Sequence, residues 1–153
     1  MCRKRRRGAA AVEFAVVAPI FFLMIFGMIE FGRMIMVQQL LTNASREGAR
    51  LAVLDGSTMA DVRTTVKDYL ESVTVTGVTD GDIEIEAVKI DADSGAETVC
   101  ADLASAGYGG RVTVTITIPF DQVSWLSSPM IMDMIDENME LSASTVMRRE
   151  TVQ

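Results

Sequence analysis

Glu13 is a carboxylate inside a long apolar stretch, and its position poses a chemical question. From Ala9 to Ile29 the chain has 21 residues, and Glu13 is the only charged one. A charge inside a membrane is costly, so an acidic residue in such a stretch is a functional hypothesis by default. The simpler interpretation is that Glu13 lies at the level of the lipid headgroups, where a charge costs little.

The residues before Glu13 point to a second interpretation, in which the chain is cut after Gly8. A basic block ends at Gly8, and the apolar stretch begins at Ala9. If a membrane peptidase cut between them, the new amine of Ala9 would begin a helix with Glu13 one turn along. A carboxylate there interacts favourably with the helix N-terminal dipole and with its own amine or that of a neighbouring helix. An unpaired Glu13 would be costly in low dielectric, so this pairing would select for assembly.

The sequence holds few groups for catalysis or metal binding. It has no histidine, which removes histidine-based triads and HExxH zinc sites, and it has no GxxxxGK[ST], GxSxG or GxGxxG motif. Cys2 and Cys100, the only cysteines, lie on opposite sides of the apolar stretch, so we expect no disulfide between them. Residues 91–102 (DADSGAETVCAD) match a calcium loop only in part, and we favour a solvated loop. We therefore expect no enzymatic activity, no cofactor and no metal.

Charge is distributed unevenly along the chain. Five of the 14 basic residues, and no acidic one, lie in the first seven positions: Arg3, Lys4, Arg5, Arg6 and Arg7. Residues 8–153 contain the other nine basic residues and all 21 acidic ones, which gives this part a net charge of −12. An acidic body argues against nucleic-acid binding, which needs a basic face. A basic block directly before an apolar stretch is a topology signal: it stays in the cytoplasm, and the C-terminal body crosses the membrane.

The apolar stretch is long enough to cross a bilayer. Its 21 residues would form a helix of about 31 Å, against a bilayer core of about 30 Å. A cleaved secretory signal would need a small-x-small site after the stretch, whereas Ile29 is followed by EFGR. We therefore divide the chain into a basic leader (1–8), a transmembrane helix (9–30) and an exported body (31–153).

Two helices are expected at the start of the body. Residues 37–52 carry an apolar stripe at spacings of three and four, which predicts an amphipathic helix that continues the transmembrane helix and ends near residues 55–56. Gly48 lies on this stripe and would let another backbone approach closely. Ser57 is a suitable N-cap for a second helix over residues 59–73.

Three strands are expected after these helices. Alternation of apolar and polar residues predicts strands over 83–90, 111–118 and 139–147. Residues 91–110 are small, acidic and glycine-rich, and we expect a mobile loop there. Residues 128–129 (Ser-Pro) are expected to begin a short helix before the last strand. The predicted fold is α+β: a transmembrane helix continuing into an amphipathic helix, then a second helix and a small three-stranded antiparallel sheet.

The N-terminal part of the sequence resembles a known family. The basic leader followed by Gly8 and AAAVEF resembles the processing site of type IV prepilins, especially the Flp type. The continuation from Arg7 to Leu54 resembles the TadE-like family, pseudopilins of tight-adherence pilus systems. The similarity extends more loosely to VTVTITIPF and LSASTVMRRE.

This resemblance implies an inner-membrane protein with a periplasmic body that serves Flp pilus assembly as a minor component. It also implies cleavage by a prepilin peptidase between Gly8 and Ala9, with Glu13 acting in assembly. The partners it implies are the lipid bilayer, the prepilin peptidase, the pilus secretion machinery and other pilins. The alternative is an uncleaved single-pass protein whose membrane-anchored periplasmic body binds a ligand. A mature N-terminus at Ala9 would favour the pseudopilin, and an intact leader the binding module.

Overall fold

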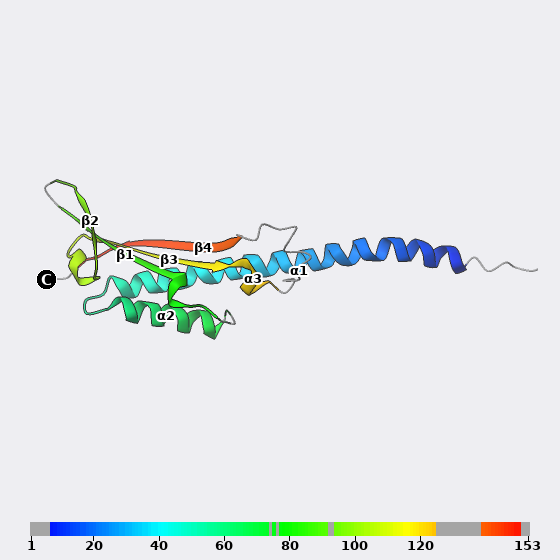
Figure 1. The fold of residues 1–153 in the computed structure, drawn as a ribbon, viewed down its shortest axis with the longest axis horizontal. Coiled ribbons are helices and arrows are strands. Elements are labelled where there is room, and N and C mark those ends of the chain that lie inside the picture. The colour runs from blue at the N-terminus through cyan, green and yellow to red at the C-terminus, as the bar shows by residue number, and fades with distance from the viewer. Residues whose placement is uncertain (1–6, 74, 76, 92–93, 125–138, 151–153) are drawn as a thin grey trace, which may run out of the picture.

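The computed structural model describes residues 7–73, 75, 77–91, 94–124 and 139–150. Its elements follow in this order: α1 (Arg7–Ala52), α2 (Met59–Ser72), the 3-10 helix η1 (Asp80–Asp82), β1 (Ile83–Ile90), β2 (Glu97–Cys100), the 3-10 helix η2 (Ala104–Ala106), β3 (Arg111–Pro119), α3 (Phe120–Val123) and β4 (Glu140–Arg148). One half of α1 projects from a body built by its other half and the remaining elements (Figure 1). The fold is α+β, as predicted. The short helix predicted to begin at residues 128–129 lies outside the described residues.

Helix α1 is continuous over 46 residues. Alanine, the strongest helix former, is its commonest residue, and its apolar stripe from Val37 onward prolongs it into the body. Pro19 lies inside the helix, where membrane helices tolerate proline. The helix ends at Ala52, and Gly56 follows with a φ of 82°, a left-handed conformation that glycine adopts without strain. The predicted continuation of the apolar helix into an amphipathic one is confirmed.

Helix α2 begins one residue later than the predicted cap implies. Its N-cap is Thr58 rather than Ser57, and the Thr58 side chain accepts a hydrogen bond from the backbone N–H of Asp61. The Asp61 carboxylate in turn accepts hydrogen bonds from the Thr58 backbone N–H at 3.0 Å and hydroxyl at 2.7 Å. This reciprocal capping box explains the shift, because only Thr58 has an acidic partner three residues ahead that returns the bond.

The sheet has four strands, not the three predicted, in the order β2-β1-β3-β4 with each neighbouring pair antiparallel. The three predicted strands correspond to β1, β3 and β4. Strand β2 lies within residues 91–110, where we predicted a mobile loop, and it pairs with β1 from Ile90 opposite Glu97 to Ala87 opposite Cys100. The loop prediction was wrong there because β2 is an exposed edge strand. Backbone pairing with β1 holds it, so its side chains show none of the burial alternation that reveals a strand in sequence.

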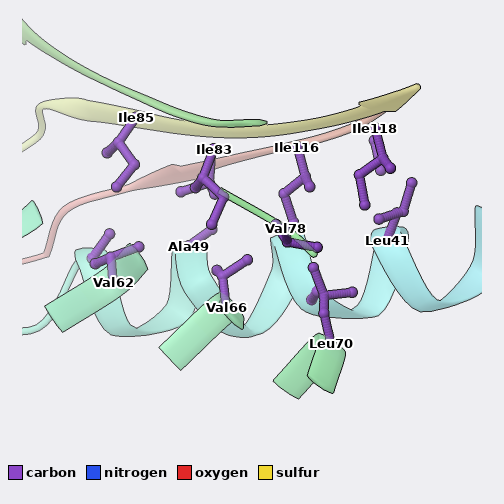
Figure 2. Packing of buried hydrophobic residues seen from close by; sticks show 14 of the residues in the cluster. Leu41, Ala49, Val62, Val66, Leu70, Val78, Ile83, Ile85, Ile116 and Ile118 are labelled. Carbon is purple, nitrogen blue, oxygen red and sulfur yellow. The ribbon is translucent and has the colours of Figure 1, made fainter. Parts of the chain in front are cut away.

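Helices α1 and α2 pack against one face of the sheet. Every second residue of β3 points to this face and is buried, including Val112, Val114 and Ile116. Figure 2 shows Val66 and Leu70 of α2 pointing toward the sheet beside α1. The predicted core stripe of α1 is confirmed by four buried residues: Val37, Leu41, Ala44 and Ala52.

Gly48 occupies the tightest point of this packing. A Cβ atom at Gly48 would lie 2.6 Å from Cγ2 of Val66, 3.4 Å from Cγ1 of Val114 and 3.5 Å from Cγ1 of Val62. The close approach predicted at Gly48 is therefore made by side chains of α2 and β3 rather than by another backbone.

A buried arginine joins three segments at the end of the body farthest from the projecting helix. Arg149 is 4% exposed. Its Nη2 donates to Oδ1 of Asp55 at 2.9 Å, and its Nη1 donates to the carbonyl oxygen of Leu103. Asp55 follows α1 and Leu103 precedes η2. Arg149 therefore ties the end of β4 to the turn after α1 and to the connection between β2 and β3.

Candidate functional site

Between Glu13 and Glu30, the projecting half of α1 carries no charge and is apolar around its whole circumference. Its large apolar side chains with more than half of their surface exposed are Val12, Phe14, Val16, Val17, Ile20, Phe21, Phe22, Leu23, Met24, Phe26, Met28, Ile29 and Phe31. A helix in water keeps a polar face, whereas a helix that is apolar on all sides is surrounded by lipid or by other apolar helices. This half of α1 therefore needs an apolar environment that the described part of the chain does not supply.

Among the described residues, α1 is the one helix long and apolar enough to cross a membrane. Its most apolar window has a mean hydropathy of 2.4, and none of that window is buried by the rest of the described chain. From Gly8 to Ile29 the helix rises about 33 Å, which matches a hydrocarbon core of about 30 Å. The helix therefore fits a single-pass membrane anchor.

Hydrogen bonds join α1 to the body immediately after the apolar half. The Nε of Arg33 donates to the carbonyl oxygen of Val123 at 2.5 Å, and the Nε2 of Gln38 donates to the carbonyl oxygen of Ser142 at 2.7 Å. Farther along α1, the hydroxyls of Ser45 and Thr145 lie 2.7 Å apart. Sequence reasoning missed these contacts, because a polar residue on a helix gives no sign of which distant oxygen it reaches.

The structure places Gly8 and Glu13 in the first two turns of α1, at the end away from the sheet (Figure 1). Glu13 is exposed, and nothing lies within 4 Å of a Cβ built at Gly8. Ala9 and Glu13 are four residues apart, so they share one face of the helix at a rise of about 6 Å. Within the described ranges Glu13 forms no salt bridge. Of the basic block, Arg7 is the first residue of α1, and Arg3, Lys4, Arg5 and Arg6 lie outside the described residues.

The body offers no metal centre within the described residues, where no group of three or more acidic, cysteine or histidine side chains could hold an ion. Near the β1–β2 turn, Oδ1 of Asp91 accepts hydrogen bonds from the backbone N–H of Ser94 at 2.9 Å and from its hydroxyl at 2.8 Å. Cys100 is a free thiol, half-buried beside the core.

The apolar half of α1 and its junction with the body coincide with a known family pattern. Residues 8–50 match the TadE-like protein family. The TadE-like region thus begins one residue after α1 begins and ends two residues before α1 ends, so it describes this single helix, anchor and core stripe together. The resemblance to the TadE-like family is confirmed, and with the candidate membrane-spanning helix it indicates a protein associated with the Tad pilus.

No curated protein and no solved structure shows a significant match to the chain. The strands and α2 lie outside the TadE-like region.

Proposed function

We propose that this chain is a minor pilin-like membrane protein, a pseudopilin, that assists the assembly of a tight-adherence/Flp-type pilus and has no enzymatic activity. The observation that carries this proposal is the coincidence of the TadE-like region with one unbroken helix. That helix is apolar on all sides between Glu13 and Glu30, and from Arg33 onward it is held in a folded body. A pilin-like subunit needs this combination, because its helix must leave the bilayer for a bundle of similar helices without unfolding the body.

The proposed topology places the basic block Arg3–Arg7 in the cytoplasm and the body in the periplasm, with α1 crossing the inner membrane. The uneven charge supports this orientation, since basic residues next to a membrane segment stay on the cytoplasmic side. A reporter that is active only in the periplasm, fused after Gln153, is expected to be active. Activity from a cytoplasmic reporter at the same position would overturn the topology.

The first proposed step is hydrolysis of the peptide bond between Gly8 and Ala9 by a prepilin peptidase. Water is consumed, the leader leaves with the new carboxylate of Gly8, and Ala9 keeps the new amine. The open space around Gly8 supports this site, because a peptidase must enclose the residue before the cut bond. The second proposed step is assembly, in which Glu13 neutralises the amine of Ala9 in its own chain or in a neighbouring subunit.

The two steps are separated by substitutions at Gly8 and Glu13. Gly8→Leu is expected to leave the leader attached, because a bulky side chain clashes in the peptidase site. Gly27→Leu is the matched control: this glycine also lies in the exposed helix with nothing within 4 Å, and cleavage should proceed normally. N-terminal sequencing of membrane-extracted protein shows for each variant whether the leader is still attached. An intact leader in the parent chain would instead favour the anchored binding module.

Glu13→Ala and Glu13→Gln are expected to be cleaved at Ala9 but to reduce pilus output. Glutamine keeps the shape and hydrogen bonding of glutamate without the charge, so it tests the charge itself. Breaking a buried ion pair costs roughly 3–5 kcal/mol, whereas an exposed pair is worth about 1 kcal/mol or less. If both variants support normal pili, Glu13 is an interfacial residue and has no role in assembly.

A further inference from the structure

The two outer strands of the sheet each present unpaired backbone groups. In β4, the backbone groups of odd-numbered residues bond to β3, because Met139 accepts from the N–H of Phe120 and the N–H of Arg149 donates to Gly110. Backbone direction alternates along a strand, so the N–H and C=O groups of Ser144, Val146 and Arg148 point away from the sheet. Within the described ranges these outward groups have no hydrogen-bond partner. We call them the β4 edge.

At the end of β4 nearest the membrane anchor, an outward backbone group already has a hydrogen-bond partner. The side chain of Gln38 donates to the outward carbonyl of Ser142, which satisfies the strand end nearest the membrane anchor. The segment from Glu140 to Arg148 carries charge only at its two ends and contains neither lysine nor proline. Natural proteins normally protect a long edge strand with such residues. The unprotected part of β4 is therefore the β4 edge.

Strand β2 presents the complementary surface at the opposite side of the sheet. The N–H of Asp91 donates to the carbonyl of Ala96, so even-numbered residues of this segment face β1. The backbone groups of Glu97 and Val99 therefore point away from the sheet, and we call them the β2 edge. Val99 is 68% exposed, and on the β4 edge Val146 is 56% exposed.

Both valines lie on the same face of the sheet, the one opposite the helices. Val146 is opposite Thr113, and Val99 is opposite Val88, which in turn is opposite Arg111. All these residues alternate with core residues such as Ala87 and Val112. In a sheet continued from one copy to the next, the two valines would stand on one surface.

The membrane anchor decides which edges can meet. Strand β4 runs in the same direction as α1, because Ser142 contacts Gln38 near its start and Arg149 contacts Asp55 near its end. Copies in one membrane have parallel helices, so antiparallel pairing of two β4 edges would place their anchors at opposite ends. Parallel pairing of two β4 edges would set Arg148 beside Arg148. The β2 edge runs opposite to β4, because the sheet contains four antiparallel strands.

We propose that the β4 edge of one copy of this chain pairs antiparallel with the β2 edge of the next copy, which extends the sheet from subunit to subunit. The outward groups align in registers two residues apart, and the one that joins apolar and opposite-charge pairs places Val146 opposite Val99 and Arg148 opposite Glu97. Because Val99 is level with Arg148 within one copy, this register shifts the next copy by two residues, about 7 Å along the strands. Glu97 already accepts from Arg111 at 2.7 Å, so Arg148 of the next copy would add a second guanidinium to this carboxylate. Cross-strand apolar and opposite-charge pairs each stabilise such a ladder.

This contact is small, and its strength depends on the anchor. An interface of a few residues is too weak to hold two free proteins together. Two bodies fixed to one bilayer meet at a high effective concentration, so a weak edge contact becomes significant there. The inference rests on the membrane anchoring in the proposed function but not on cleavage at Gly8.

Disulfide cross-linking of the full-length protein in its membrane tests the pairing. In a Cys2→Ser/Cys100→Ser background, the Val99→Cys/Val146→Cys variant is treated with a mild oxidant and run on a non-reducing gel. Opposed residues of a hydrogen-bonded antiparallel pair have Cα atoms about 5.5 Å apart, within reach of a disulfide. Because each copy offers one of each edge, the expected product is a ladder of dimers, trimers and larger species. The matched control is Val99→Cys/Ser142→Cys, whose second thiol lies about 13 Å along the same strand and should not react.

Each single-cysteine variant is expected to remain monomeric, and co-expression of the two single variants should give mixed dimers without larger species. Arg148→Glu is expected to reduce the cross-linked fraction about two- to fivefold, the effect of an exposed charge pair. The proposal is overturned if the double variant forms no more product than the controls, or if Val146→Cys alone dimerises. Cross-linking only to a different protein also overturns it. Sequencing of the N-terminus in the same samples tests the proposed function separately, since a ladder with an intact leader would refute cleavage and leave the edge pairing in place.

Discussion

Replacing Gly48 by alanine tests whether α1 packs against α2 and the sheet as tightly as the structure indicates. The added Cβ would lie 2.6 Å from Cγ2 of Val66, where carbon atoms prefer about 3.5–4.0 Å. Val66 is fully buried, and its β-branched side chain has one strongly preferred rotamer in a helix. The contact therefore cannot be relieved by a simple side-chain rotation.

Two opposing effects determine the free energy of unfolding of Gly48→Ala. Alanine is about 1 kcal/mol better than glycine inside a helix, which stabilises the variant. Overpacking a well-filled core costs about 1–3 kcal/mol, which destabilises it. With a contact this short we place the overpacking near 2 kcal/mol, so the net expectation is a loss of about 1 kcal/mol.

The measurement is denaturant unfolding of the detergent-solubilised full-length chain, followed by the fluorescence of its single tryptophan. Gly32→Ala is the matched control, because Gly32 lies in the same helix with nothing within 4 Å, and it should be neutral or slightly stabilising. Val66→Ala alone should lose roughly 2 kcal/mol through the cavity it leaves. Combined with Gly48→Ala it should lose less than the sum, because the new methyl occupies part of that cavity.

Tight packing at Gly48 is refuted if Gly48→Ala is as stable as Gly32→Ala and its effect adds to that of Val66→Ala. Additivity would mean that residue 48 and Val66 do not share a contact, and α1 would then pack in another register.

Three further predictions concern the body. Leu41→Asp buries an unpaired charge in the core and should destabilise the body by several kcal/mol, seen as faster proteolysis; unchanged resistance would mean that Leu41 is not a core residue. Arg149→Met keeps the bulk of the side chain but removes the hydrogen bonds to Asp55 and to the carbonyl of Leu103. We expect denaturant unfolding to show a loss of about 1–3 kcal/mol in the free energy of unfolding, and a loss near zero would mean that these bonds do not stabilise the fold. The hydrogen bond from Lys67, and then its charge, hold the pKa of Asp80 below its ordinary value of 3.8. The charged carboxylate therefore stabilises the folded protein above that pH, and this contribution is lost as the pH falls through the lower folded pKa. Asp80→Asn should flatten the acid limb of a curve of stability against pH, and an unchanged acid limb would refute the pairing.

The long helix was predictable because its signals are local. An uninterrupted apolar run followed by a stripe at helical spacing fixes both the anchor and the buried face, and Val37 and Leu41 are buried as expected. Strands β1 and β3 were predictable for the same reason, since alternation along one strand reports which face is covered.

Strand β2 and the hydrogen bonds of Arg149 were not predictable, because both depend on partners far away in sequence. Nothing in residues 97–100 records that β1 offers free backbone groups, and nothing around Arg149 records that Asp55 and Leu103 come within reach. The cap of α2 was misplaced by one residue, because Ser57 and Thr58 are both good caps and only the returning bond from Asp61 distinguishes them.

The candidate processing and assembly residues remain predictions of the sequence. Gly8 and Glu13 lie together at the tip of the helix that the TadE-like region defines. The roles predicted for them are interactions with other molecules, a peptidase and a neighbouring amine, so no contact within one chain reports on them.

The absence of any loop between the apolar half of α1 and the body, both described without interruption from residue 7 to residue 52, has a mechanical consequence. A body joined to its anchor by a flexible tether would tumble, whereas a body built on the anchor helix itself is held upright. Its remaining large freedoms are lateral diffusion in the plane of the membrane, spin about the helix axis and tilt of the helix and body together. Two copies therefore find each other mainly by diffusing in the plane of the membrane and turning about their helix axes. Any axial force applied to the helix also reaches the sheet directly, with no slack to take up.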